Sequence, residues 1–286
     1  MIVKVTGGLG NQLFQYSFGQ FLHKNTGMEV FYYFDTVNNS RSFTNRDHEL
    51  SKFNLDFAIA DQEACSKYKI KNGLLGRFKR KITQLLPFIS DTYVVQQGPH
   101  DYTSKLQDAY YDGYWQIYEY PETIKEKLQT RLQLSAEQLI KFKELINNFE
   151  SENSVAIHIR RSDYITIPAN AKIFNVCDKK YYDDAIAIIN SRVANAKYYI
   201  FTQDMDWAKE NFVGTDFVFV EGNSAIEDML LMAKCKHNII ANSTFSWWSA
   251  FLNKNIDKII IAPKKWYKTN LNNSTSNLIF QEWIRL

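Results

Sequence analysis

Short apolar runs and longer amphipathic segments alternate along residues 155–262. The short runs are rich in β-branched and aromatic residues, as is typical of buried strands, whereas the longer segments repeat their apolar residues at helical spacing. This pattern predicts strands from residue 155 and over 198–202, 217–220, 237–241 and 258–262, and helices over 179–192, 225–236 and 246–253, with a short helix after residue 204. Strict alternation of strand and helix implies a parallel sheet with crossover helices.

The beginning of the chain predicts a second unit of the same kind. Residues 2–6 are typical of a strand, 7–12 of a tight turn, and the following apolar spacing of a helix that ends near Lys24, before a strand over 29–34. Further on, Ser135 and Gln138 form a capping-box pattern that predicts a helix over 136–149. We therefore expect an α/β protein with two Rossmann-like domains, residues 1–150 and 151–286.

Composition narrows the class of protein. With 286 residues, 45% of them apolar, the chain is long enough for two ordinary domains. The net charge of +3, from 34 basic and 31 acidic residues, does not call for a nucleic-acid partner. The three cysteines are widely spaced, which argues for a reducing compartment and against a disulfide framework. Since no secretory signal and no run of about 18 apolar residues occurs, we expect a cytoplasmic protein.

A basic segment interrupts the first half of the chain. Its cationic residues, with no acidic residue among them, are Lys67, Lys69, Lys71, Arg77, Lys79, Arg80 and Lys81. Apolar residues between 74 and 86 make the segment amphipathic, which suits peripheral contact with an anionic surface, here the inner face of the cytoplasmic membrane, or with a pyrophosphate-bearing acceptor. A solvated helix face gives the same pattern, and no nucleic-acid-binding motif accompanies the charge.

Charge is concentrated where the strand that starts at residue 155 ends. Alternation places His158 and Arg160 on one face of that strand, and Arg161 follows at its C-terminal edge. Ligands of open α/β sheets bind at this edge, and an arginine there fits a pair of phosphate oxygens. The motif predicts an anionic ligand. The alternative is an exposed strand end in which Arg160, Arg161 and Asp163 form a local ion pair.

A small polar loop with similar potential follows the strand predicted over 237–241. It contains Ser243, Thr244, Phe245 and Ser246 and leads directly into a helix. Its amides, its hydroxyls and the positive end of the helix predict a phosphate site. The alternative is ordinary capping of the helix by one of the hydroxyl side chains.

Two acidic positions in this half are candidates for donor binding. Glu227 falls three residues after Ser224, so a capping box accounts for it. The neighbouring Asp228 is not needed by that box and is placed to accept a hydrogen bond from the N–H edge of guanine. Asp204 also follows a strand, although its position favours an N-cap.

The glycine-rich turn near the start is a further candidate. Gly8 and Gly10 can admit a phosphate or a sugar hydroxyl close to the backbone at a helix N-terminus. Asn11 and Gln12 add amide donors and acceptors. The dinucleotide fingerprint fits badly, because Leu13 stands where a third glycine is required. A purely structural turn is the alternative.

Together these segments resemble the bacterial α-1,2-fucosyltransferases, which use GDP-fucose. The resemblance covers most of the chain and rests on residues 7–16, 112–116, 158–164, 227–228 and 242–248. It implies a GT-B fold with two Rossmann-like domains facing across a cleft. It further implies that Arg161 holds the donor pyrophosphate, that His158 contacts nucleotide or fucose, that residues 243–246 bind phosphate, and that Asn11 lies beside the acceptor.

The resemblance also implies the reaction. L-Fucose would pass with inversion from GDP-β-L-fucose to the 2-hydroxyl of a terminal β-galactoside, in a galactose-terminated oligosaccharide or a lipid-linked glycan such as an O-antigen or capsule repeat. Departure of GDP requires stabilisation of negative charge on the β-phosphate, which Arg161 and the helix start near Ser246 can provide. We therefore expect no cofactor and no metal, and the sequence lacks an Asp-any-Asp cluster and paired His or Cys ligands.

The general base is left open by the sequence. Asp163 lies close to the arginines but is equally suited to orienting Arg160 or His158. Asp35 and Glu49 lie in the acceptor-side half, and Asn11 offers an indirect route through a water that it orders.

Two other classes of protein remain as alternatives. One is a non-catalytic GDP-sugar- or glycan-binding module that uses Trp115 and Trp247 as platforms, and the complete motif at 158–164 counts against it. The other is an oxidoreductase that uses the glycine-rich turn, and the missing third glycine counts against that.

Overall fold

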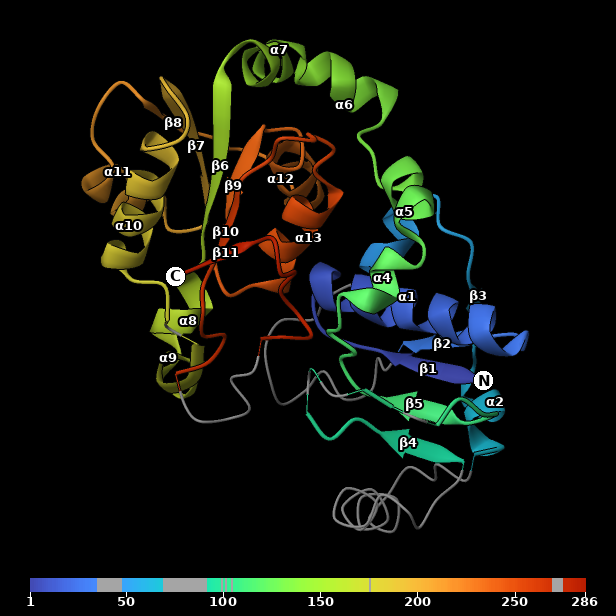
Figure 1. Ribbon diagram of the computed structural model, residues 1–286. Helices are drawn as coiled ribbons and strands as arrows, with labels where there is room; N and C mark the ends of the chain where they lie inside the picture. Colours follow the sequence, from blue (N-terminus) through green and yellow to red (C-terminus); the bar gives the residue numbers. More distant parts are fainter. Residues whose placement is uncertain are drawn as a thin grey trace. The chain divides into compact units, whose positions relative to one another are not determined.

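The computed structural model describes residues 1–34, 48–68, 92–98, 100, 102–103, 105–174, 176–268 and 275–286. The chain forms two compact units, Met1–Arg131 and Leu132–Leu286 (Figure 1). Each contains its own parallel sheet, so the predicted α/β class with two Rossmann-like domains is confirmed. The division lies ahead of the expected boundary at residue 150, because the helices over 136–151 belong to the second unit, where the later one contacts that unit's sheet.

The first unit is built on a five-stranded sheet with the order β3-β2-β1-β5-β4. Its strands are β1 (Ile2–Val5), β2 (Phe31–Phe34), β3 (Ala58–Ile59), β4 (Tyr93–Val95) and β5 (Tyr110–Asp112). Its helices are α1 (Leu9–Thr26), η1 (Glu49–Lys52), α2 (Gln62–Ser66), α4 (Glu119–Glu122) and α5 (Lys125–Arg131). The predicted strand, turn, helix and strand at the start are confirmed as β1, α1 and β2, whereas β3, β4 and β5 were not predicted.

The second unit has a six-stranded sheet with the order β11-β10-β9-β6-β7-β8. Its strands are β6 (Asn153–Ile159), β7 (Ala196–Thr202), β8 (Phe217–Phe219), β9 (His237–Ile239), β10 (Ile260–Ala262) and β11 (Ile284–Arg285). Its helices are α6 (Ala136–Lys141), α7 (Lys143–Ser151), α8 (Ser162–Thr166), α9 (Pro168–Phe174), α10 (Lys179–Asn190), α11 (Met205–Asn211), α12 (Ala225–Met232) and α13 (Thr244–Leu252). Every strand predicted in this half is present.

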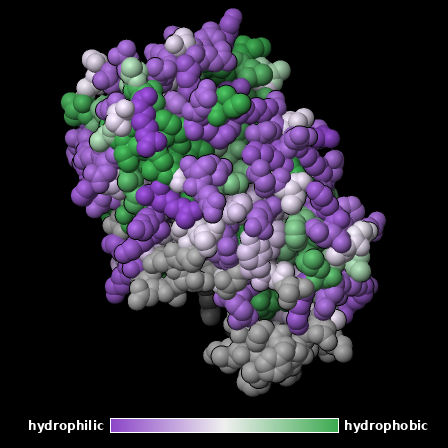
Figure 2. Space-filling model, in the orientation of Figure 1, coloured by the Kyte–Doolittle hydropathy of each residue, from purple (hydrophilic) through white to green (hydrophobic). Residues whose placement is uncertain are grey.

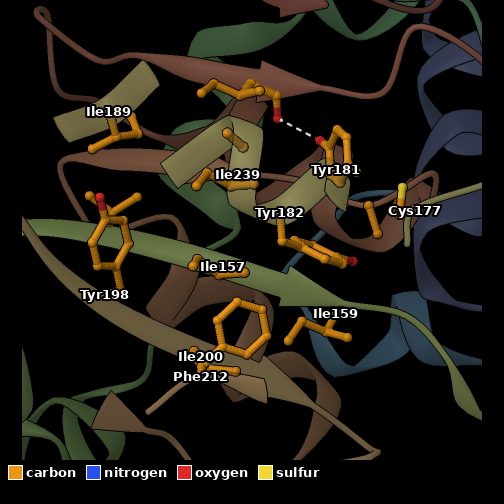
Figure 3. Close-up of a cluster of buried hydrophobic side chains, with 14 of the residues drawn as sticks. Ile157, Ile159, Cys177, Tyr181, Tyr182, Ile189, Tyr198, Ile200, Phe212 and Ile239 are labelled. Carbon is orange, nitrogen blue, oxygen red and sulfur yellow. Dashed lines mark hydrogen bonds between the residues drawn. The ribbon is translucent and has the colours of Figure 1, made fainter. Parts of the chain in front are cut away.

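The core of the second unit decides which way the polar residues of β6 face. Ile157 and Ile159 lie in a buried apolar cluster with Tyr181 of α10 (Figure 3). The Tyr181 hydroxyl donates a hydrogen bond to the Ile240 carbonyl oxygen at 2.6 Å. Because side chains alternate along a strand, His158 lies on the opposite face of the sheet from this cluster.

Several helices begin at the capping residues that the sequence indicates. Ser135 and Gln138 form their capping box, as do Ser224 and Glu227, and both predictions are confirmed. Asp178 accepts a hydrogen bond from the Tyr181 backbone N–H and so caps the start of α10. The helix predicted over 136–149 is instead two helices, because Phe142 between them departs from helical geometry with φ −101° and ψ 14°.

Hydrophilic side chains dominate the face of the molecule shown in Figure 2, with smaller hydrophobic patches between them. Within the described parts of the chain, no helix combines the length and the apolar character that crossing a membrane demands. The three cysteines are buried thiols.

Candidate active site

Sheet order points to a ligand site in the second unit. From β6 the chain proceeds through β7 to β8 on one side, and from β9 through β10 to β11 on the other. The order therefore reverses between β6 and β9, and open α/β sheets bind ligands in the crevice at such a switch point, beyond the carboxyl ends of the strands. Ile157 pairs with Ile239, so Arg160 and Asn242 each lie three residues past that pair. The arginine motif and the polar loop before α13 thus meet at one edge.

Direct contacts confirm that these two motifs adjoin. The Tyr164 hydroxyl donates a hydrogen bond to the Asn242 carbonyl oxygen at 3.3 Å. The rings of His158 and Phe245 lie 5.3 Å apart between centroids, tilted by 49°. Residues that the sequence separates by about 80 positions therefore form a single site.

His158 is neutral in this setting. Its side chain is only 6% exposed, and burial lowers the pKa of the imidazole to about 3, with the charge of Arg160 adding to the effect. Its Nδ1 is buried and has no hydrogen-bond partner among the described residues. The ring is therefore suited to a hydrogen bond with a neutral group rather than to pairing with a phosphate charge.

The two arginines have different surroundings. Arg160 donates from Nη1 to Gln203 Oε1 at 3.5 Å and lies over the Tyr164 ring. Arg161 donates from Nε to Asp204 Oδ2 at 2.9 Å. Its guanidinium carbon lies 4.1 Å from the centroid of the Trp207 ring, and its side chain is 22% exposed. The alternative interpretation of the motif expected a local ion pair. An ion pair is present, but it joins Arg161 to Asp204, which follows the neighbouring strand β7.

The expected N-cap position of Asp204 is confirmed, but its side chain does not cap the helix. Asp204 occupies the N-cap position of α11, yet its side chain makes no capping hydrogen bond. Its carboxylate is directed to Arg161 instead, because β6 and β7 are neighbours and both residues lie just past the strand ends. Sequence analysis also missed Trp207, which lies in the first turn of α11, three residues after Asp204.

The loop before α13 is shaped by its own polar groups. Ser243 is the N-cap residue but its side chain makes no capping hydrogen bond, so the capping alternative is wrong for this residue. Ser246 is fully buried and its hydroxyl lies within hydrogen-bonding distance of the Ala241 and Ser243 carbonyl oxygens. Asn242 donates to the carbonyl oxygens of Phe174 and Trp266, which fixes the loop.

The start of α13 keeps its positive character. Thr244 is the first residue of the helix, and the first turn contains no acidic side chain. The partial positive charge of the helix end is therefore not neutralised from within the helix, which is a suitable setting for a phosphate group.

The two acidic residues at the start of α12 differ in environment. Glu227 completes the capping box and accepts a hydrogen bond from Lys141 at 2.8 Å, which holds its pKa at about 2. Asp228 accepts from Asn223 Nδ2 at 3.1 Å, and burial raises the pKa of its carboxyl to about 6. Glu227 is therefore structural, whereas Asp228 retains a lone-pair direction for a ligand donor.

The first unit has a switch point of its own, between β1 and β5. Gln15 joins the segments that follow these strands, since its Oε1 accepts from the Thr6 N–H at 2.9 Å and its Nε2 donates to the Gly113 carbonyl at 3.0 Å. Asn11 Oδ1 accepts a hydrogen bond from Gln116 Nε2 at 3.1 Å. These amides lie at the edge where ligands of such sheets bind.

Backbone geometry shapes this second cluster. Gly7 has a φ of 80°, and a Cβ there would lie 2.6 Å from Asn11 Nδ2, so glycine is required. Gly8 is the N-cap of α1, and Gly10 is buried within its first turn. Trp115 also has a positive φ, 53°, and Gln96 Oε1 accepts hydrogen bonds from its N–H and from that of Tyr114. This turn directs the next residue, Gln116, towards Asn11.

The tryptophans considered as platforms belong to the core. Trp115 is fully buried and stacks on Phe18 at 4.1 Å between centroids. Trp247 is also fully buried and donates from Nε1 to the Leu278 carbonyl oxygen. Neither presents a ring to a glycan, which removes the feature on which a pure binding module depended.

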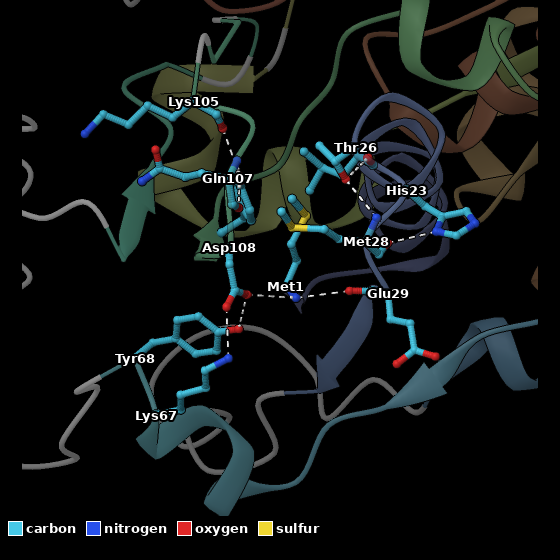
Figure 4. A network of polar contacts seen from close by, with 12 residues as sticks. Met1, His23, Thr26, Met28, Glu29, Lys67, Tyr68, Lys105, Gln107 and Asp108 are labelled. Carbon is cyan, nitrogen blue, oxygen red and sulfur yellow. Dashed lines mark hydrogen bonds and ion pairs between the residues drawn. The ribbon is translucent and has the colours of Figure 1, made fainter.

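Several predictions concern residues that the structure does not describe. They are Asp35, the side chain of Asp163, and the basic segment beyond Tyr68. Lys67, its first cation, pairs with Asp108 at 2.9 Å in a polar network that includes the Tyr68 hydroxyl (Figure 4). Glu49 pairs with Lys52 at 2.8 Å. Within the described ranges, no three His, Cys, Asp or Glu side chains gather into a group that would hold a metal ion.

The family model described as Glycosyl transferase family 11 matches residues 1–286. The chain is 31% identical to an alpha-1,2-colitosyltransferase of Escherichia coli, over 100% of this chain and 98% of that protein. It is 30% identical to the O-antigen biosynthesis glycosyltransferase WbnK of Escherichia coli, over 99% of both. It is also 28% identical to galactoside alpha-(1,2)-fucosyltransferase 2 of Rattus norvegicus, over 48% of this chain and 41% of that protein.

Among solved structures, Arabidopsis thaliana FUT1 in complex with GDP is similar, with a TM-score of 0.50 and 12% identity over 91% of this chain and 69% of that chain. At this identity the likeness concerns the fold alone.

Proposed function

Because the chain belongs to glycosyl transferase family 11, we propose that it is an inverting galactoside α-1,2-fucosyltransferase. It moves L-fucose from GDP-β-L-fucose to the 2-hydroxyl of a terminal β-galactoside in a surface glycan, of O-antigen or capsule type. Two relatives that align along their whole length support this proposal, one named an α-1,2-colitosyltransferase and the other an O-antigen biosynthesis glycosyltransferase.

The observation that carries the proposal is the meeting of Arg161 and the start of α13 at the β6–β9 switch point. When the bond between fucose and GDP breaks, negative charge grows on the β-phosphate. A guanidinium that is already held in place, together with a helix N-terminus, stabilises that charge without reorganisation at the moment of reaction. Arg161 therefore receives the terminal phosphate, and the loop at 243–246 receives the diphosphate from the helix side.

His158 and Asp228 then serve the uncharged parts of the donor. As a neutral imidazole, His158 exchanges a hydrogen bond with a sugar or ribose hydroxyl. Asp228, when ionised, accepts from the N–H edge of guanine, and this contact distinguishes guanine from bases that lack two adjacent donors.

The acceptor is assigned to the first unit. Asn11 and Gln116 already join through one hydrogen bond, and Gln116 Oε1 is buried without a partner among the described residues. Amide groups of this kind exchange hydrogen bonds with sugar hydroxyls. The acceptor proton leaves either to Asp163 or to a water held at Asn11.

A second donor is favoured by one observation, the 31% identity to an α-1,2-colitosyltransferase. Colitose is 3-deoxy-L-fucose, so the two donors differ by a single hydroxyl on the transferred sugar. A site that hydrogen-bonds this hydroxyl rejects the deoxy donor strongly, whereas an apolar site discriminates weakly. Both GDP-linked sugars therefore belong in the test.

The first experiment is release of GDP from GDP-fucose with lactose as acceptor, in excess chelator. GDP-colitose, GDP-mannose and UDP-galactose are the donor comparisons, and a reaction without lactose measures hydrolysis. If GDP is released from GDP-fucose only when lactose is present, the result supports the proposed donor, the proposed reaction class and activity without a metal. If GDP-colitose is the preferred donor, the transferred sugar in the proposal is colitose instead of fucose. Binding of GDP-fucose without turnover on any galactoside of a panel indicates the binding-module alternative, and no binding at all contradicts the proposed site.

A further inference from the structure

We propose that Trp207 and Asp204 are positioning residues that hold Arg161 with its terminal nitrogens directed to the donor diphosphate. The inference rests on the proposed function, since it explains how Arg161 is prepared for its role there. It also assigns a role to Trp207 and changes the role expected for Asp204.

Strand register brings the three residues together. Ile159 of β6 pairs with Thr202 of β7, so Arg161 and Asp204 each lie two residues beyond that pair. Asp204 occupies the N-cap position of α11, and Trp207 lies in the first turn of that helix, three positions later. One helical turn therefore supplies both a carboxylate and an aromatic ring to the same guanidinium.

These contacts occupy distinct parts of Arg161. Asp204 Oδ2 accepts from Nε at 2.9 Å, and the guanidinium carbon lies over the Trp207 ring, 4.1 Å from the ring centroid. The Nη1 and Nη2 edge is not used by either neighbour. A guanidinium held on its Nε side and over an aromatic ring presents that edge in a restricted direction, and such an edge can bind two phosphate oxygens at once.

Asp204 acts through Arg161 rather than on the donor itself. A carboxylate repels a diphosphate, so a direct contact with the phosphates is unfavourable. Its other role, capping of α11 by its side chain, is not realised. Trp207 also has a structural contact, an edge-to-face arrangement with Phe212 at 6.0 Å, and the test must separate this packing from the contact with Arg161.

The first test compares the affinities for GDP and GMP, measured by calorimetry, in Trp207→Leu, Trp207→Phe and Phe212→Leu. GMP lacks the phosphate assigned to Arg161, so the ratio of the two affinities isolates that contact. We expect Trp207→Leu to reduce the GDP-to-GMP preference about fivefold, the scale of a partly exposed cation–π contact. Trp207→Phe retains a ring and should restore most of it. Phe212→Leu disturbs the same packing and should leave the ratio unchanged.

The second test compares Asp204→Asn with Asp206→Asn. Both remove one negative charge near the start of α11, but Asp206 is exposed and makes no contact with Arg161 in the structure. We expect Asp204→Asn to lower kcat for transfer from GDP-fucose about tenfold, with a smaller change in donor KM, because orientation matters most when charge develops in the transition state. Asp206→Asn should match the unmodified protein in both constants.

The outcomes separate the two proposals. If Arg161→Ala leaves the GDP-to-GMP ratio unchanged, the phosphate assignment in the proposed function is wrong. If Arg161→Ala abolishes the preference while Trp207→Leu and Asp204→Asn behave like their controls, the positioning role alone is refuted. Equal losses in Trp207→Leu and Phe212→Leu would show that Trp207 only packs.

Discussion

Replacement of Arg161 is the sharpest perturbation that the structure offers. Arg161→Ala removes the guanidinium that we propose stabilises the leaving GDP, and it leaves the Asp204 carboxylate without its partner. Arg161→Lys keeps the charge but has no Nε donor for Asp204 and no planar group to lie on Trp207. The pair of variants therefore separates charge from orientation.

The expected size follows from the remaining contacts of the side chain. With Nε paired, Arg161 has one edge for the phosphate, which is comparable to one preorganised group that stabilises transition-state charge. Loss of such a group lowers kcat by about 100- to 1000-fold, or about 2.7–4 kcal/mol. The unpaired carboxylate adds a repulsion, which solvent weakens because Asp204 is 32% exposed. The kcat of Arg161→Lys should lie between those of Arg161→Ala and the unmodified protein, about tenfold below the latter.

The assay is GDP release at saturating GDP-fucose and lactose, with kcat and KM for each variant and a thermal unfolding curve to confirm folding. Arg192→Ala is the matched control, because Arg192 is an exposed arginine that follows α10 and has no place in the site. The double variant Arg161→Ala with Asp204→Asn should recover part of the lost rate, by less than tenfold. A kcat within about threefold of the unmodified protein for Arg161→Ala would refute the reasoning.

Three further outcomes are expected. Gly7→Ala should lower the thermal midpoint more than Gly27→Ala, because both positions have a left-handed φ, but a Cβ meets Asn11 at 2.6 Å in the first and open space in the second. Hydrogen bonds from Tyr68 and Lys67 lower the pKa of Asp108, so its contribution to stability is present above about pH 4 and is lost as the pH falls. Urea unfolding from pH 6 to 2 should therefore show a weaker acid dependence in Asp108→Asn, by a small margin because the carboxyl is 44% exposed. Burial raises the pKa of Asp228 to about 6, so the KM for GDP-fucose should rise as the pH falls from 7 to 5, and a flat KM in the unmodified protein would contradict guanine recognition by this carboxylate.

The fold could be predicted where apolar runs and amphipathic helices alternate regularly along the chain. The elements from β6 to β10 could be predicted because each strand lies in an apolar run. Each helix between them has an amphipathic pattern or a cap, such as Asp178 at the start of α10. Strands β3, β4, β5 and β11 have two or three residues each, and no regular alternation with amphipathic helices surrounds them. Strands β8, β9 and β10 are just as short, but they lie in the alternating pattern of residues 155–262. Their place comes from tertiary pairing, such as that of Tyr111 with Val3 of β1.

The site was predictable as a set of motifs but not as a set of contacts. The arginine motif and the loop at 243–246 each indicate a polar segment at the end of a strand. Because the sheet is parallel, both segments lie at the same edge of it. The partner of Arg161 was not predictable, since it depends on the register of β6 against β7, and local spacing favoured an N-cap for Asp204. The link between Asn11 and Gln116 spans 105 positions and depends on the unusual backbone of Trp115.

The charges at the β6–β9 edge also bear on the general base. Burial lowers the pKa of His158 to about 3, so the imidazole does not titrate between pH 5 and 9. At saturating donor, where Asp228 no longer limits binding, stabilisation of the leaving GDP is therefore independent of pH in this range. Because protonation of Asp204 would also release Arg161, the kcat profile is measured in Asp204→Asn as well. An acid inflection that persists in this variant belongs to the group that receives the acceptor proton. If Asp163 is that base, kcat should fall below about pH 4–5 and Asp163→Asn should abolish both the inflection and most of the rate. A kcat without an inflection down to pH 4, together with an active Asp163→Asn, would assign the proton to the water held at Asn11.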